Sequence, residues 1–155
     1  MKKFIKSAAA KNDDPRGTAR PNPPAHILVV EDDFYVRLLN TEVLERSGYQ
    51  VDTAEDGVAA WNALHTAHYD LLITDNNMPN LSGVELVKKM RAEEMTLPVI
   101  MATGALPRQE LEQNPSLKIA ATLLKPFTTA QLVELVKKIL QLSAEARKLV
   151  SPLPG

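Results

Sequence analysis

The sequence predicts an α/β domain in which a parallel β-sheet is covered by helices on both faces. Five short apolar segments alternate along the chain with five segments of helical periodicity, an order typical of parallel sheets. Segments 27–30 and 71–73 are continuously apolar rather than alternating, which is typical of strands buried on both faces. Crossovers between parallel strands are right-handed, so each helix is expected to pack back onto the sheet.

The two ends of the chain differ in composition from its middle. Residues 1–24 contain six Lys or Arg against two Asp, together with four prolines, so they bury too little apolar surface to offset their ordering entropy. We predict a disordered basic N-terminal tail over residues 1–24, a folded domain over residues 25–143 and a C-terminal tail over residues 144–155. Lys6 interrupts the apolar stretch near the N-terminus, which argues against a signal peptide, and no segment reaches the ~20 apolar residues of a membrane span.

Composition argues against several classes of protein. The formal net charge is −1 and the isoelectric point is about 6.3, so a nucleic-acid-binding domain is not indicated. The chain has no cysteine, which excludes a disulfide framework and a thiolate metal site. The spacing of His26, His65 and His68 matches no zinc pattern, and these side chains are expected to be solvated or capping. We expect a soluble, cytoplasmic protein.

The first half of the domain is expected to hold two strands and two helices. Residues 27–30 form a buried strand that ends in three acidic residues, and a helix follows that Gly48 can stop. A short strand over residues 49–53 and a helix over residues 56–64 come next. The apolar stripes of these two helices are Val36, Leu39 and Val43, then Ala60, Trp61 and Leu64.

The second half continues the alternation. Residues 71–74 form a strand that ends at Asp75, and Pro79 forces the chain to turn. Ser82 can cap a helix that runs to about residue 94, with Glu85 completing a capping box. The remaining elements are a strand over residues 99–102, a short helix over residues 107–113, a strand over residues 119–124, and a final helix from Thr128 or Thr129 to about Leu142.

Polar side chains stand at the carboxyl ends of four predicted strands: Glu31 and Asp32, then Asp75, Thr103 and Lys125. In a parallel sheet these ends lie along one edge, where open α/β sheets place their ligands. Three carboxylates there repel one another, and Mg²⁺, which binds few carboxylates and keeps several waters, would relieve the repulsion. An Asp nucleophile, a magnesium ion, a hydroxyl and a lysine are the parts of phosphoryl transfer to a carboxylate, which would give an aspartyl phosphate.

Each of these residues alone has a plainer explanation. Glu31 and Asp32 can cap a helix, Asp75 can cap the next loop, Thr103 can be a strand residue, and Lys125 can be a solvated charge. Their placement along a single edge favours a functional site, because chance alone rarely brings all of them there.

Four stretches of this chain resemble those of the receiver domains of two-component response regulators, the chemotaxis regulators among them. They are ILVVEDD, LLITDNNMPNLSGVEL, VIMATGA and LLKPF, in this order, within residues 26–142. The resemblance implies a flavodoxin-like, doubly wound sheet of five parallel strands in the order 2-1-3-4-5.

The resemblance also implies roles for individual residues. Asp75 would accept a phosphoryl group from a histidine kinase or a histidine phosphotransfer protein. Mg²⁺ would be bound directly by Asp32 and Asp75, through water by Glu31, and by the backbone carbonyl of Asn77. Thr103 would donate a hydrogen bond to the phosphoryl group.

Lys125 would pair with another phosphoryl oxygen, and the bond between Lys125 and Pro126 is expected to be cis. The chain departs from the family at Thr122, where an aromatic residue is usual. In the family that ring swings inward on activation, a step that Thr122 cannot perform.

The leading functional hypothesis is a stand-alone receiver that signals by protein–protein contact rather than as an enzyme. A shuttle in a relay and an end-point regulator fit the sequence equally well. A receiver-like scaffold that is not phosphorylated is an alternative. A magnesium-dependent phosphatase with an Asp nucleophile is disfavoured because its general acid would stand at Asn77. A dinucleotide carrier would need a Gly-rich turn after the first strand, which is absent.

The target of signalling is expected to bind at the last strand and helix, and a homodimer is left open as well. One apolar stripe of the final helix is suited to the core (Leu132, Leu135, Ile139 and Leu142). A second stripe could be partly exposed as a partner site (Val133, Val136 and Leu140).

Overall fold

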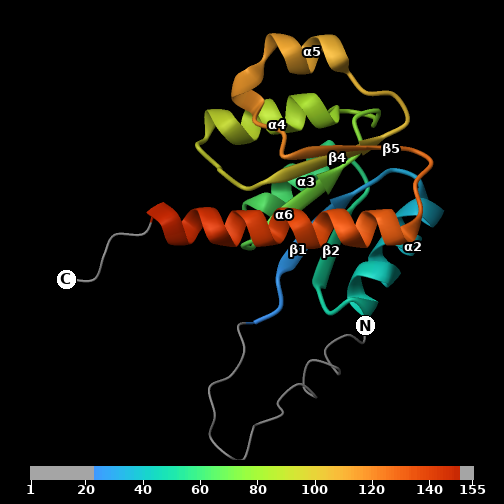
Figure 1. Ribbon diagram of the computed structural model, residues 1–155. Coiled ribbons are helices and arrows are strands. Elements are labelled where there is room, and N and C mark those ends of the chain that lie inside the picture. The colour runs from blue at the N-terminus through green and yellow to red at the C-terminus, as the bar shows by residue number, and fades with distance from the viewer. Residues whose placement is uncertain (1–22, 151–155) are drawn as a thin grey trace, which may run out of the picture.

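The computed structural model describes residues 23–150, and nearly all of the predicted N-terminal tail lies outside them. Five parallel strands form one sheet in the order β2-β1-β3-β4-β5, which confirms the predicted fold and strand order (Figure 1). The strands are β1 (His26–Val30), β2 (Gln50–Ala54), β3 (Leu71–Thr74), β4 (Val99–Thr103) and β5 (Ala121–Leu124).

Helices cover both faces of the sheet. They are α2 (Phe34–Arg46), α3 (Gly57–Leu64), α4 (Gly83–Ala92), α5 (Arg108–Gln113) and α6 (Thr129–Val150), with a 3-10 turn η1 (Pro115–Leu117). Side chains of α2 and α6 pack in one apolar cluster, and side chains of α3, α4 and α5 pack in another. None of the helices in residues 23–150 is long and apolar enough to cross a membrane.

The central strands supply both clusters because successive side chains point to opposite faces of a sheet. In β3, Leu72 belongs to the cluster beneath α3 and α4, whereas Leu71 and Ile73 belong to the cluster beneath α2 and α6. All of these side chains are 2% exposed or less. This two-sided burial explains why the strand reads as a continuous apolar run.

Acidic and hydroxyl side chains begin the helices that follow β1 and β3. Asp33 caps α2 by accepting hydrogen bonds from the amides of Tyr35 and Val36 at 2.9 and 3.1 Å. Ser82 and Glu85 form the predicted capping box of α4. These caps fix the points where the chain leaves the carboxyl edge of the sheet.

The prediction that the last helix ends near Leu142 was wrong, because α6 continues to Val150. Its buried line consists of Leu132, Val136 and Ile139, whereas Leu142 is 52% exposed. In α2, Leu39 was expected to face the core but is 53% exposed, and Leu44 is buried instead.

Candidate functional site

Three carboxylates lie together at the carboxyl edge of the sheet. Val30 of β1 pairs with Thr74 of β3, so the residues that follow them, Glu31 and Asp75, come side by side. Glu31, Asp32 and Asp75 each offer an oxygen atom, and these atoms all lie within 4.8 Å of one another. Glu31 and Asp75 are buried, whereas Asp32 is exposed.

The loop after β3 orients the carboxylate of Asp75. Its Oδ1 accepts hydrogen bonds from the backbone amides of Asn76 at 2.6 Å and Asn77 at 3.2 Å. Its Oδ2 accepts a hydrogen bond from the Lys125 ammonium at 3.0 Å. Each carboxylate oxygen therefore has a defined partner, which limits rotation of the side chain.

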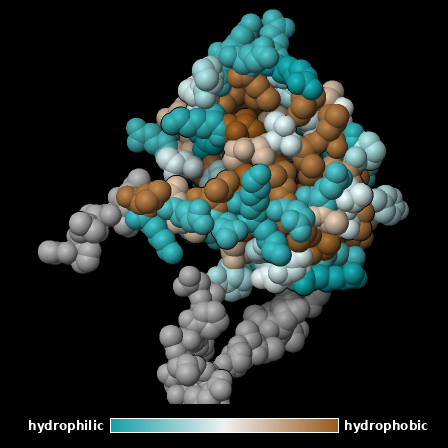
Figure 2. All heavy atoms as spheres, viewed as in Figure 1, coloured by the Kyte–Doolittle hydropathy of each residue, from teal (hydrophilic) through white to brown (hydrophobic). Residues whose placement is uncertain are grey.

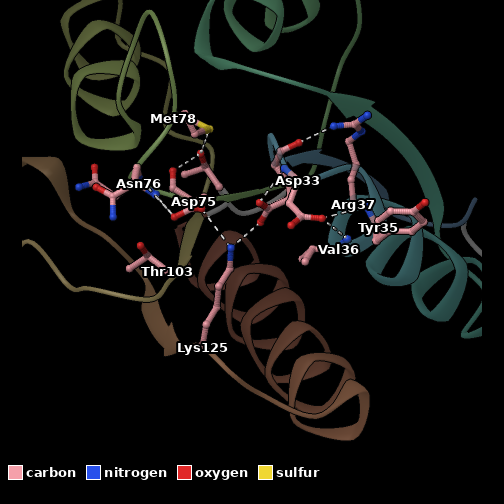
Figure 3. Close-up of polar contacts among 12 residues, drawn as sticks. Asp33, Tyr35, Val36, Arg37, Asp75, Asn76, Met78, Thr103 and Lys125 are labelled. Atoms are coloured by element: carbon pink, nitrogen blue, oxygen red, sulfur yellow. Dashed lines mark hydrogen bonds and ion pairs between the residues drawn. The ribbon is translucent and has the colours of Figure 1, made fainter.

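Lys125 reaches the carboxylates from the end of β5. Its Nζ lies 2.8 Å from Glu31 Oε1 and 3.0 Å from Asp75 Oδ2, and Figure 3 shows this ammonium between the two strand ends. Burial by itself would lower the pKa of Lys125, but the bonds to Glu31 and Asp75 outweigh burial and raise it. The lysine therefore stays charged at neutral pH.

Burial raises the pKa of Glu31 above its ordinary value, even though hydrogen bonds from Lys125 and from the backbone amide of Asp33 oppose the shift. Among residues 23–150, one ammonium, that of Lys125, lies within ion-pair distance of a cluster of three carboxylates, so the site carries excess negative charge. Oxygen ligands with excess negative charge suit a hard divalent cation such as Mg²⁺.

The other two predicted site residues lie nearby but do not bond to the acidic cluster through their side chains. Thr103 ends β4 and is buried, and its hydroxyl lies 3.5 Å from the carbonyl oxygen of Ala105 (Figure 3). Asn77 is exposed and contacts Asp75 through its backbone amide. The peptide bond between Lys125 and Pro126 is cis, as expected.

Sequence reasoning missed two residues that hold the loop after β3 in place. Asn76 is buried, and its Oδ1 accepts a hydrogen bond from the amide of Val84 in the first turn of α4 at 2.9 Å. Gly83 lets α4 approach this loop, because a Cβ there would clash with the carbonyl oxygen of Asp75 and lie 3.0 Å from the Cα of Asn76. Both residues lie within a quoted motif, but only the fold reveals their contacts.

Arg37 was also missed. Its guanidinium donates a hydrogen bond to the backbone carbonyl of Glu31 at 2.7 Å and so ties α2 to the end of β1 (Figure 3). Arg37 lies six residues after Glu31, a spacing that neither a helix nor a strand brings into contact, so sequence periodicity does not predict this hydrogen bond.

The histidines lie in different surroundings, each near a carboxylate outside the acidic cluster. His26 lies 3.0 Å from Asp52, His65 lies 3.0 Å from Glu93, and His68 lies 3.7 Å from Asp70. His65 is also the C-cap residue of α3, in line with the expectation of a capping histidine.

Two curated proteins are similar to this chain in sequence. The chain is 33% identical over 118 residues to the chemotaxis protein CheY of Pseudomonas aeruginosa, covering 74% of this chain and 95% of CheY. It is 42% identical over 102 residues to the sensor protein EvgS of Escherichia coli, covering 66% of this chain but only 8% of EvgS.

Solved structures show the same fold. CheY4 of Vibrio cholerae superposes with a TM-score of 0.68 at 29% identity, covering 75% of this chain and 98% of that chain. The response regulator TrrA of Thermotoga maritima, solved in complex with Mg²⁺ and BeF, gives a TM-score of 0.66 at 32% identity, covering 74% of this chain and 97% of that chain.

The sequence also matches the family of response regulator receiver domains over residues 27–137. Receiver domains are phosphoacceptor modules of two-component signalling rather than enzymes that turn over a substrate. The strand order, the acidic edge and these matches together show that the chain belongs to the response regulator receiver domain family.

Proposed function

We propose that Asp75 accepts a phosphoryl group from a histidine kinase or a histidine phosphotransfer protein, and that the reaction requires Mg²⁺. The observation that carries the proposal is the position of the Lys125 ammonium, 3.0 Å from Asp75 Oδ2 within a cluster of three carboxylates. Asp75 is thereby held next to both a cation and a set of oxygen ligands.

Different residues of the chain would act as nucleophile, as phosphoryl ligands and as metal ligands in this transfer. A carboxylate oxygen of Asp75 attacks phosphorus, the new P–O bond forms as the P–N bond to the donor histidine breaks, and the electron pair leaves with the imidazole. Lys125 and the hydroxyl of Thr103 would then bind oxygens of the phosphoryl group. Glu31, Asp32, Asp75 and the carbonyl of Asn77 would hold Mg²⁺, which supplies positive charge to the transferred group.

The proposed output is protein–protein contact by a stand-alone receiver in the cytoplasm. Support comes from the likeness to CheY of Pseudomonas aeruginosa, 95% of whose length is matched. This chain also matches a small part of the much longer EvgS. The test of the stand-alone role should therefore be made on the natural chain.

Phosphorylation can be tested with a small donor such as acetyl phosphate and intact-mass spectrometry. We expect one phosphoryl group to be added in the presence of Mg²⁺ and none when the metal is chelated. Asp75→Asn should accept no phosphate, whereas Asp70→Asn, at the opposite edge of the sheet, should behave like the natural chain. Undiminished phosphorylation of Asp75→Asn would contradict the assignment, and a natural chain that accepts no phosphate would favour the scaffold alternative.

A further inference from the structure

The side chain of Asn76, next to the acidic cluster, is a buried polar group that joins two elements. Hydrophilic side chains are spread over the surface of the chain, as Figure 2 shows for the face that α6 crosses, whereas Asn76 is only 9% exposed. Its Oδ1 accepts a hydrogen bond from the amide of Val84 at 2.9 Å, and its backbone carbonyl accepts one from the amide of Gly83 at 3.0 Å. A buried polar group destabilises a fold unless it is hydrogen-bonded, and these two bonds satisfy both oxygen atoms.

The first turn of α4 depends on Asn76 for two of its three leading amides. The first amides of a helix have no partner within the helix and must find one outside it. The amides of Gly83 and Val84 both donate to Asn76, whereas the amide of Glu85 donates to the cap residue Ser82 at 3.1 Å. The start of α4 is therefore tied directly to the loop after β3.

The same residue contacts the carboxylate of Asp75. The backbone amide of Asn76 donates to Asp75 Oδ1 at 2.6 Å, and the amide of the following Asn77 donates to the same oxygen at 3.2 Å. In the proposed function, the carboxylate of Asp75 and the carbonyl of Asn77 are both metal ligands. The bond from Asn76 to Val84 therefore holds the segment that carries two proposed ligands, although the side chain of Asn76 is not itself a ligand.

We propose that Asn76 is a positioning residue that sets the affinity of the acidic site for Mg²⁺ by tying the loop after β3 to the first turn of α4. The inference rests on the proposed function, because it requires that the acidic cluster binds the metal. Groups that orient metal ligands from outside the ligand set commonly change metal affinity by about 10- to 100-fold when they are removed. The coupling is reciprocal, so bound metal must in turn stabilise the bond between Asn76 and Val84.

Calorimetry of Mg²⁺ binding to variants separates positioning from the simple loss of a helix cap. Asn76→Leu keeps a side chain of similar size that accepts no hydrogen bond, and we expect it to bind Mg²⁺ about 10- to 100-fold more weakly than the natural chain. Ser82→Ala is the matched control, because it also removes one bond to the first turn of α4 but leaves the bond from Asn76 in place. It should unfold at a lower urea concentration, yet bind Mg²⁺ like the natural chain.

Asn76→Asp is the conservative variant, because it keeps an accepting oxygen for the amide of Val84. Its added charge attracts the metal, so the comparison is made at about 1 M salt, which screens charges beyond about 3 Å. We expect Asn76→Asp to bind Mg²⁺ at least as tightly as the natural chain under these conditions. Binding as weak as that of Asn76→Leu would overturn the proposal.

Hydrogen exchange of the natural chain gives a test that needs no variant. Saturating Mg²⁺ should slow exchange of the Gly83 and Val84 amides more than that of the Glu85 amide, which Ser82 caps in the same turn. Equal slowing of the three amides would overturn the proposal, as would equal Mg²⁺ affinities of Asn76→Leu and Ser82→Ala. Those results leave the proposed function intact, whereas a natural chain that binds no Mg²⁺ would overturn the proposed function and this inference together.

Discussion

At the scale of single residues, the acidic cluster concentrates more negative charge than Lys125 can offset. Burial raises the pKa of Glu31 within this cluster, against the opposing hydrogen bonds from Lys125 and the Asp33 amide, and the charge of Asp75 adds a smaller contribution in the same direction. A carboxyl whose pKa is raised by folding binds protons more tightly in the folded state. Its contribution to stability is therefore full below its ordinary pKa of 4.5 and is lost as the pH rises through the folded pKa.

Because folding raises the pKa of Glu31, the charged carboxylate destabilises the fold at pH 7. We therefore expect Glu31→Gln, measured with a chelator present, to unfold at a higher temperature than the natural chain at pH 7. The difference should shrink as the pH falls toward 4.5, because Glu31 of the natural chain then becomes protonated and neutral. Thermal unfolding followed by circular dichroism measures both effects. Glu42→Gln removes an exposed carboxylate on α2 and serves as the control. A lower unfolding temperature for Glu31→Gln at pH 7 would show that the bond to Lys125 outweighs burial.

At the scale of elements, the position of α4 depends on the absence of a side chain at Gly83. A Cβ there would clash with the carbonyl oxygen of Asp75, which is backbone and cannot move aside cheaply. We expect Gly83→Ala to lower the free energy of unfolding by about 1–3 kcal/mol, the usual cost of overpacking. Urea titration measures this loss.

Gly104→Ala is the matched control for Gly83→Ala, because a Cβ at Gly104 meets nothing within 4 Å. Gly83→Ala should also slow phosphorylation by acetyl phosphate, since its α4 must shift away from the loop that orients Asp75. Equal stability of the two variants would contradict the close approach of α4.

The elements also show what the sequence could and could not reveal. Strand ends were predictable because each of the four relevant strands is an apolar run followed at once by a polar residue. The end of α6 was not, because the prolines at positions 152 and 154 favour a tail that begins at Ser143. The following residues include Ala144, Glu145, Arg147 and Leu149, which are good helix formers, and no Gly or Pro intervenes before Pro152.

Side-chain contacts across the fold were beyond the reach of periodicity. Asn76 bonds to Val84 and Arg37 bonds to Glu31 through loops and helix ends whose geometry no local pattern encodes. In α2, apolar residues occupy both the inner and the outer side, so spacing alone could not choose between Leu39 and Leu44 as the core residue.

At the scale of the whole molecule, the acidic site and the last turns of α6 lie toward opposite edges of the sheet. The site is at the carboxyl ends of the strands. The last turns of α6 reach the amino edge, where Ser143 and Arg147 line a hollow together with Asp70 and Pro98, which directly precede β3 and β4. In the proposed function, a signal from Asp75 to the last helix starts at the carboxyl edge, where β4 ends at Thr103 and Lys125 follows β5.

The route of that signal is expected to run through Thr103 and the loop of residues 104–107. Thr122 on β5 is exposed and lacks the ring that swings inward in the family, whereas Thr103 is buried and its carbonyl accepts a hydrogen bond from the amide of Lys125 at 2.9 Å. A shift of Thr103 toward a phosphoryl group would therefore move both the loop after β4 and the end of β5.

Hydrogen exchange with Mg²⁺ and beryllofluoride, a phosphoryl mimic, tests this route. We expect altered protection in residues 104–107 and in the first turns of α6, and no change in Asp75→Asn. A Thr122→Tyr variant should show the same change in the loop, because the route does not use the side chain at position 122. If only the acidic site responds while the loop and α6 remain unchanged, the signal does not travel through Thr103. If the loop responds only in Thr122→Tyr, the aromatic ring is required after all.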